Sequence, residues 1–92
     1  PKEIGSLTNL KELILYGLPL TELPKEIGNL TNLEKLNLTD ANLNSLPQEM
    51  KKLKRLEQLW IQNAFSYEFR KKFPYDIIEE LTSLKLLDLN GL

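Results

Sequence analysis

The chain contains 92 residues, 13 of them acidic and 12 basic, and it has no cysteine and no histidine. This length allows one small domain, and the missing residue types remove disulfides and the usual ligands of zinc, copper and haem. The formal net charge of −1 gives no overall field that would attract nucleic acid or an anionic membrane. No apolar run approaches the roughly 20 residues that cross a bilayer. We therefore expect no cofactor, no metal, no membrane span and no nucleic-acid partner.

A repeated pattern begins at the first residue and sets the order of the predicted elements. Pro1, Pro24 and Pro47 fall 23 residues apart, and another unit starts at Pro74 after an interruption. The predicted units are 1–23, 24–46, 47–73 with an insertion at 65–72, and 74–92. The apolar residues of the first three units coincide at these positions: Ile4, Ile27, Met50; Leu7, Leu30, Leu53; Leu10, Leu33, Leu56; Leu13, Leu36, Leu59; Leu15, Leu38, Ile61.

Each unit predicts a short helical turn followed by a strand. The spacing of three from Ile4 to Leu7 suits a short helix or 3-10 turn, and a leading proline is tolerated in the first turn. In the pattern L-x-L, Leu13 and Leu15 point to one face of a strand and Ile14 points to the other. Because no unit can bury its leucines alone, stacked units are expected to form a parallel sheet over one continuous leucine core.

The segment LPKEIGNLTNLEKLNL, residues 23–38, carries a family resemblance. It is similar to the bacterial leucine-rich repeat of 23 residues, whose units read LPxEIGxLTNLxxLxLxxNxL. The whole chain resembles this family, as about three and a half units. The resemblance implies an α/β leucine-rich repeat solenoid: a right-handed superhelix with a parallel β-sheet on the concave side and short helical or 3-10 turns on the convex side. It also implies a segment of a longer protein.

One position departs from the family pattern. The asparagine that usually follows the strand is replaced in the four units by Leu18, Ala41, Ala64 and Leu92. We therefore expect no buried asparagine ladder. Small or apolar side chains should pack at these positions instead.

The outward face of the predicted sheet forms a grid that can be read from the alternation of side chains. Its central column is Ile14, Asn37, Trp60 and Asp88, between Glu12, Lys35, Gln58, Leu86 on one side and Tyr16, Thr39, Gln62, Asn90 on the other. These positions share no chemistry from unit to unit, as expected for a specialised surface. Trp60 must point away from the core, and a large exposed aromatic residue is typical of a binding anchor. The predicted protein-binding residues of this concave face are Tyr16, Asn37, Trp60, Gln62 and Asp88.

The insertion follows the strand of Trp60, and residues 65–75 contain five of the seven aromatic residues. Insertions in solenoids form loops at an edge, so Phe65, Tyr67, Phe69 and Arg70 are predicted at the rim of the binding surface. The spacing of Phe65 and Phe69 suits a helical turn, whereas Phe65, Tyr67 and Phe69 also alternate as in an extended segment; the length favours the helix. Phe73 takes the core position of the leucine before each proline. The alternative is that the aromatic residues only cover Trp60 and close the wider loop.

Residues 51–72 are rich in basic side chains. The run contains Lys51, Lys52, Lys54, Arg55, Arg70, Lys71 and Lys72. It predicts either a basic patch for an acidic partner or an ordinary solvated charged surface.

These features predict a protein that binds other proteins and is not an enzyme. The common general base and thiol nucleophile are absent, and so is any glycine-rich phosphate-binding motif. The resemblance implies a bacterial secreted or cell-surface protein that contacts a host or partner protein through the concave sheet. Two alternatives remain open: self-association through uncapped solenoid ends, giving a homo-oligomer, and electrostatic binding through the basic patch at 51–72.

Overall fold

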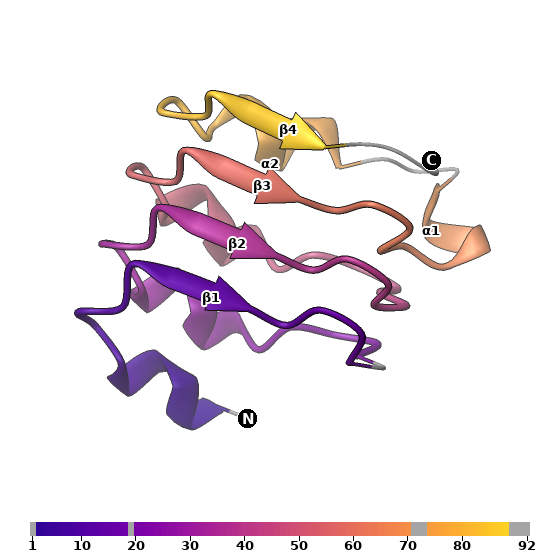
Figure 1. Ribbon diagram of the computed structural model, residues 1–92, viewed down its shortest axis with the longest axis horizontal. Coiled ribbons are helices and arrows are strands. Elements are labelled where there is room, and N and C mark those ends of the chain that lie inside the picture. The colour runs from indigo at the N-terminus through magenta and orange to yellow at the C-terminus, as the bar shows by residue number, and fades with distance from the viewer. Residues whose placement is uncertain (1, 19, 71–73, 89–92) are drawn as a thin grey trace.

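A computed structural model of the chain describes residues 2–18, 20–70 and 74–88. Figure 1 shows four strands side by side in one layer, with the helical turns in a second layer behind them. In chain order the elements are η1 (Lys2–Ser6), β1 (Glu12–Ile14), η2 (Lys25–Asn29), β2 (Lys35–Asn37), η3 (Gln48–Lys52), β3 (Gln58–Trp60), α1 (Tyr67–Arg70), α2 (Tyr75–Glu79) and β4 (Leu86–Asp88). The turns η1, η2 and η3 are 3-10 helices.

The strands form one parallel sheet in the order β1-β2-β3-β4. Leu13, Leu36, Leu59 and Leu87 lie opposite one another, so each unit meets the next at the same repeat position. The pairing continues past the strand ends, where the Leu38 N–H donates to the Trp60 carbonyl at 2.7 Å. The parallel sheet and the 3-10 turns confirm the predicted leucine-rich solenoid.

The core lies between the sheet and the helical turns. The inward residues of the second and third units are completely buried, as the parity of L-x-L predicts. They are Ile27, Leu30, Leu33, Leu36, Leu38, Met50, Leu53, Leu56, Leu59 and Ile61. The matching residues of the first unit are only partly buried or exposed, because they contact a neighbouring unit on one side.

The prolines stand just before the helical turns rather than inside them. Pro24 and Pro47 are the N-cap residues of η2 and η3, with extended backbones at φ −66° and −70°. These angles are close to the value that the proline ring imposes. Each proline carbonyl then accepts a hydrogen bond at 3.1 Å, from the Ile27 and Met50 N–H groups, and so starts the turn.

The helical turns approach one another so closely that the second unit needs a glycine. A Cβ atom added to Gly28 would lie 2.6 Å from the Glu49 carbonyl oxygen of the next turn. The third unit has Lys51 at the same repeat position, and the Nζ atom of Lys51 lies 3.7 Å from Asp76 Oδ2 in α2. The contact between the third and fourth units therefore accepts a long side chain where the contact between the second and third does not.

The departure from the asparagine pattern has the expected result in the inner units. Ala41 and Ala64 are buried in the core, so small side chains fill the position where the family has asparagine. Leu18 of the first unit is exposed, because this unit is covered on one side only. Leu92 lies outside the described residues.

One position of the predicted outward grid is wrong. Thr39 is buried, although Tyr16 and Gln62 at the same repeat position are exposed. Thr39 is the smaller side chain in the middle of this row, and its backbone N–H donates to Asn37 Oδ1 at 2.9 Å. Just beyond it the backbone turns through left-handed conformations at Gly17, Asp40 and Asn63. Asn90 of the same row lies outside the described residues.

Candidate functional site

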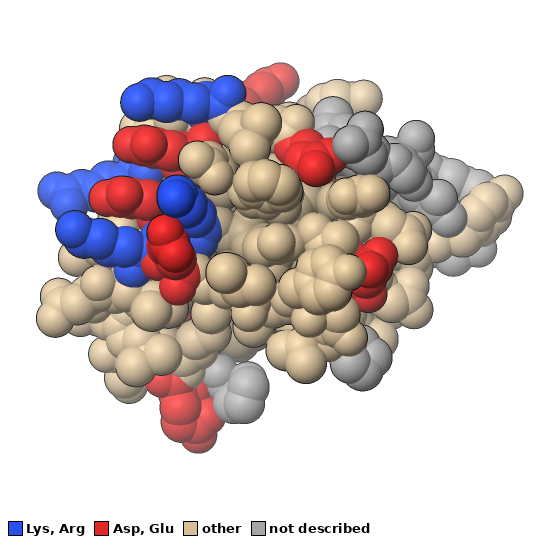
Figure 2. Space-filling model, in the orientation of Figure 1, with Lys and Arg blue, Asp and Glu red and all other residues tan. Residues whose placement is uncertain are grey.

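A groove crosses the concave face over the first three strands. Its volume is about 250 Å³. The lining residues come from the starts and the ends of the strands, two from each: Glu12, Ile14, Lys35, Asn37, Gln58 and Trp60. Figure 2 shows that charged residues of both signs gather over the strand starts, whereas the centre of this face is largely uncharged.

The register of the sheet places three different side chains across the groove. Ile14 pairs with Asn37, and Asn37 pairs with Trp60, so the isoleucine and the tryptophan stand two strands apart. At the usual strand spacing their Cα atoms are separated by roughly 10 Å. Ile14 is 64% exposed, whereas Asn37 and Trp60 are half-buried. The groove thus has one apolar wall on each side and a polar side chain between them.

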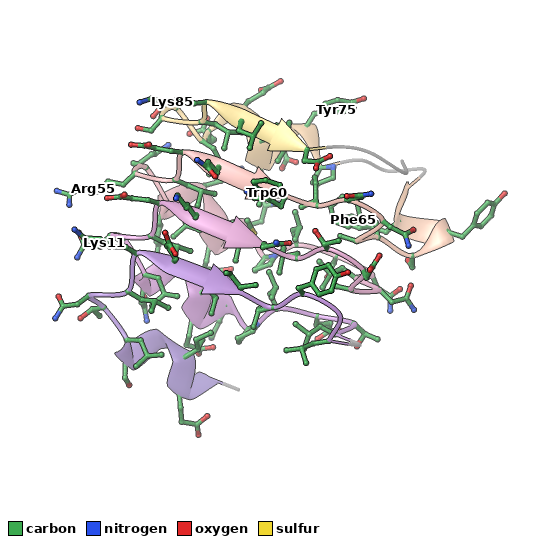
Figure 3. All side chains as sticks on the ribbon, in the orientation of Figure 1. Lys11, Arg55, Trp60, Phe65, Tyr75 and Lys85 are labelled. Carbon is green, nitrogen blue, oxygen red and sulfur yellow. The ribbon has the colours of Figure 1, made fainter. Side chains whose placement is uncertain are left out.

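Trp60 points away from the leucine core, as the alternation predicts. Figure 3 shows it over the middle of the sheet face. The Trp60 Nε1–H donates to Gln58 Oε1 at 3.4 Å, which holds the indole along its own strand. Asp88 of β4 lies opposite Trp60 on the side away from the groove.

The structure brings together two of the five predicted concave residues at the groove. Asn37 and Trp60 line it, whereas Tyr16 and Gln62 lie beyond the strand ends and Asp88 lies on the next strand. Glu12, Ile14, Lys35 and Gln58 also line the groove and were not selected from the sequence. Their register could have identified them, since they occupy the first two columns of the predicted grid.

The prediction of a rim contact is wrong for Phe65. Its side chain is 3% exposed and belongs to the core cluster, and its backbone pairs in parallel with Leu43. Phe69 is half-buried against the same core, and the two rings meet edge to face with centroids 4.9 Å apart. These two aromatic residues therefore close the wider loop, as one part of the alternative interpretation held; that they also cover Trp60 stays a prediction.

The insertion contains the helical turn that its length predicted. The turn α1 follows Ser66, whose Oγ atom accepts a hydrogen bond from the Phe69 N–H at 3.3 Å, as an N-cap does. Tyr67 is 65% exposed, and its role as a rim contact stays a prediction. The Arg70 side chain and residues Lys71, Lys72 and Phe73 lie outside the described part of the chain, so their predicted roles remain predictions.

Three basic residues of the run at 51–72 contact neighbouring units. Lys51 lies 3.7 Å from Asp76, Lys54 lies 3.2 Å from Glu80, and the Arg55 Nη1–H donates to Asn32 Oδ1 at 2.8 Å. These side chains link one unit to the next along the exposed surface.

On this surface the carboxyl group of Asp76 has a lowered pKa. Gln48 Nε2 donates a hydrogen bond to Asp76 Oδ2 at 3.2 Å, and Lys51 adds a weaker charge attraction. Both interactions favour the ionised carboxylate, so the pKa of Asp76 lies below its ordinary value. This carboxylate is on the convex side and has no part in the groove.

The architecture defines a class of repeat protein: a solenoid with a uniform leucine core and a concave sheet whose side chains differ from unit to unit. The sequence comparison agrees, since the family model described as "Leucine-rich repeat region" matches residues 1–92. The chain belongs to the leucine-rich repeat family.

A solved leucine-rich repeat protein of Leptospira interrogans is similar in structure, with a TM-score of 0.80 and 35% sequence identity. The match covers 98% of this chain and 22% of that protein, so the chain spans about a fifth of the length of its relative. No curated protein matches the chain. Within the described ranges, no helix has the length and apolar character needed to cross a membrane.

Proposed function

We propose that the chain is a non-enzymatic scaffold that binds a partner protein through its concave sheet face, with Trp60 as the central contact. The observation that carries this proposal is the groove between Ile14 and Trp60, which opens on the face where side chains vary between units. Leucine-rich repeat proteins generally bind proteins, and solenoids use their extended concave surfaces for this purpose. The fold and family support this general role.

Trp60 has the properties of a binding hot spot. It is half-buried, so a partner would complete the removal of its ring from water without having to order a fully mobile side chain. Its Nε1–H group already has a partner in Gln58 Oε1, so covering the indole leaves no unpaired donor. Tyr16 is exposed beyond the end of β1 and would extend the contact.

The proposal can be tested with a phage-displayed library of random 12-residue peptides panned on the purified chain. We expect enriched peptides whose affinity falls by about 2 kcal/mol or more in Trp60→Ala, the loss that defines a hot spot, and by less in Tyr16→Ala. Tyr75→Ala is the control matched to Tyr16→Ala, because Tyr75 is a tyrosine of similar exposure at the start of α2, away from the groove. Isothermal titration calorimetry of synthetic peptides gives the affinities. If both concave variants bind as well as the wild type, the concave face is not the site.

The place where such a partner would be met is a further part of this proposal. We infer a bacterial secreted or cell-surface protein that contacts a host protein, because the units follow the 23-residue bacterial type of repeat. Fractionation of the source cells, with an antibody against the chain, tests this part of the proposal. Detection only in the cytoplasmic fraction would contradict it.

Self-association is a second candidate function, favoured by the exposed surface of the first unit. Leu7 and Leu18 are exposed there, and a small hollow of about 130 Å³ lies among apolar side chains that include Leu15 and Leu20. Burying such leucines against a second copy would be favourable. Light scattering over a wide concentration range should then show a dimer that Leu18→Asp dissociates. A monomer at all concentrations would exclude this function.

A further inference from the structure

We propose that the concave groove recognises a carboxylate side chain, Asp or Glu, that neighbours an apolar residue in an extended segment of the partner protein. This inference rests on the proposed function of the concave face and adds the chemistry of the partner. It follows from the hydrogen-bond donors that the groove leaves unused between its two apolar walls.

Asn37 lines the groove on the strand between Ile14 and Trp60. The Thr39 backbone N–H can only donate, so the oxygen of the Asn37 side chain must be the atom that lies 2.9 Å from it. This contact fixes the orientation of the amide and directs Nδ2 toward other partners. In the described part of the chain no acceptor bonds to Nδ2, so its N–H groups are available to a ligand.

Gln58 repeats this arrangement on the neighbouring strand. The Trp60 indole N–H also can only donate, so its contact at 3.4 Å must be to the oxygen of the Gln58 amide. The Nε2 group of Gln58 has no acceptor among the described residues. Both amides thus use their oxygens within the protein and offer nitrogens to the groove, which selects a ligand with acceptor oxygens.

Lys35 makes a charged acceptor more favourable than a neutral one. Lys35 and Glu12 both line the groove, and Lys35 Nζ lies 3.3 Å from Glu12 Oε1, with about half of each side chain exposed. An exposed ion pair of this kind contributes little to stability, so the ammonium can turn to a ligand carboxylate at small cost. A carboxylate accepts several hydrogen bonds at once and matches donors from Lys35, Asn37 and Gln58.

The walls and size of the groove account for the apolar neighbour. Ile14 and Trp60 face the space from its two sides, and both bury more surface when an apolar side chain lies between them. A volume of about 250 Å³ is at the small end for a cofactor or drug-sized ligand and suits one or two side chains. An extended segment presents alternate side chains to a sheet face, with those between directed away from it.

The variant Asn37→Asp tests the donor chemistry with almost no change in shape. Aspartate keeps an oxygen for the Thr39 N–H and replaces the Nδ2 donor by a second oxygen with negative charge. Peptides enriched on the wild-type chain from the 12-residue display library should contain Asp or Glu beside an apolar residue. Their affinity, measured by calorimetry, should fall by at least about tenfold in Asn37→Asp, because a charged ligand loses a donor and meets a like charge.

Asn42→Asp is the matched control. The substitution adds the same charge, and Asn42 is exposed and lies outside the groove. Peptides in which the acidic residue is replaced by its amide, Asn or Gln, separate the carboxylate from a neutral acceptor and should bind more weakly. Circular dichroism and thermal unfolding confirm that each variant folds. Panning Asn37→Asp itself should enrich peptides with Lys or Arg in place of the acid.

The possible outcomes separate this inference from the proposed function. If Trp60→Ala weakens binding but Asn37→Asp and the amide peptides do not, the groove binds protein and the carboxylate preference is wrong. If neither variant weakens binding, both proposals fail. Failure to enrich any peptide would also overturn the inference, because an accessible groove with this chemistry should select extended segments.

Discussion

The first two units have nearly the same sequence and very different burial. They begin PKEIGSLTNL and PKEIGNLTNL, yet Leu7 is 52% exposed and the equivalent Leu30 is completely buried. Ile4 and Ile27 show the same contrast, the first half-buried and the second fully buried. The difference cannot come from the side chains, so it comes from the number of neighbouring units.

This contrast shows where the stability of the solenoid lies. A buried leucine of the second unit contacts its own unit and the units on both sides, as expected when stability is a sum over neighbours. In the described residues, η1 packs against η2 only, whereas η2 packs against both η1 and η3. Substitutions at the same repeat position should therefore cost most in the second and third units.

The largest expected effect is at Phe65. Replacing this buried ring with alanine, Phe65→Ala, should lower the free energy of unfolding by about 3 to 5 kcal/mol. Leu43 pairs with Phe65, and Leu20 is the residue one repeat before Leu43. Leu20 is only half-buried, so Leu20→Ala should lower the free energy of unfolding by about 1 kcal/mol. Urea denaturation followed by circular dichroism measures both. Phe65→Leu is the control and should cost less than about 1.5 kcal/mol. Equal losses in the two alanine variants would contradict the comparison.

Leu30 and Leu7 provide the most direct test, because their local sequences match. We expect Leu30→Ala to lower the free energy of unfolding by about 2 to 5 kcal/mol through cavity formation. Leu7→Ala should change it by about 0.5 kcal/mol or less, since half of this side chain is already in water. Chemical denaturation at several protein concentrations gives both values. A large loss in Leu7→Ala that grows with concentration would instead show that a second copy covers the first unit.

Gly28 and Gly5 extend the comparison to the convex side. In Gly28→Ala the new methyl group meets the Glu49 backbone, so η2 and η3 must separate, at a cost of about 1 to 3 kcal/mol. At Gly5 a Cβ atom would lie 2.9 Å from Glu26 Cβ and 3.2 Å from its carbonyl oxygen. The first unit has a neighbour on one side and can move outward, so Gly5→Ala should cost less than about 1 kcal/mol. Thermal unfolding of both variants measures the two losses of stability. A larger loss in Gly5→Ala than in Gly28→Ala would contradict this explanation.

Much of the fold could be predicted from the sequence because period and parity are local properties. The 23-residue spacing gave the turns and strands, and L-x-L gave the inward residues. The low burial of the first unit follows from its place at an end of the stack and not from local sequence, since Leu7 and Leu30 have nearly the same neighbours in the chain. Phe65 was misplaced because it was assigned to the insertion at 65–72, whereas the structure pairs it with Leu43 and buries its ring.

The sequence predicted which positions face outward on the sheet, but not which of those residues line the groove. Selection by residue type chose large or distinctive side chains such as Trp60, Tyr16 and Asp88. The groove depends instead on which side chains from three adjacent strands enclose a space, and this includes Lys35 and Gln58. The orientation of the Asn37 amide depends on a backbone group two residues away, and no pattern of residue types indicates it.

The smallest expected effect concerns the exposed polar contacts between units. Gln48 and Lys51 of the third unit hold the pKa of Asp76 below its ordinary value, with the Gln48 hydrogen bond as the larger cause. A carboxyl whose pKa is lower in the folded chain stabilises that chain above its unfolded pKa. The contribution is lost as the pH falls through the folded pKa. Gln48→Ala should therefore raise the pKa of Asp76 and reduce the loss of stability in acid.

Carbon-detected NMR titration of the Asp76 carboxyl measures this shift directly, and Lys51→Ala should move the pKa less than Gln48→Ala does. Glu12 and Lys35 form the corresponding exposed pair between the first and second units, with side chains that are similarly open to water. Neither contact can replace the apolar burial that distinguishes the second unit from the first, because exposed ion pairs are screened by water and contribute little to stability. If Gln48→Ala destabilised the chain as much as Leu30→Ala, polar links rather than leucine stacking would hold the units together.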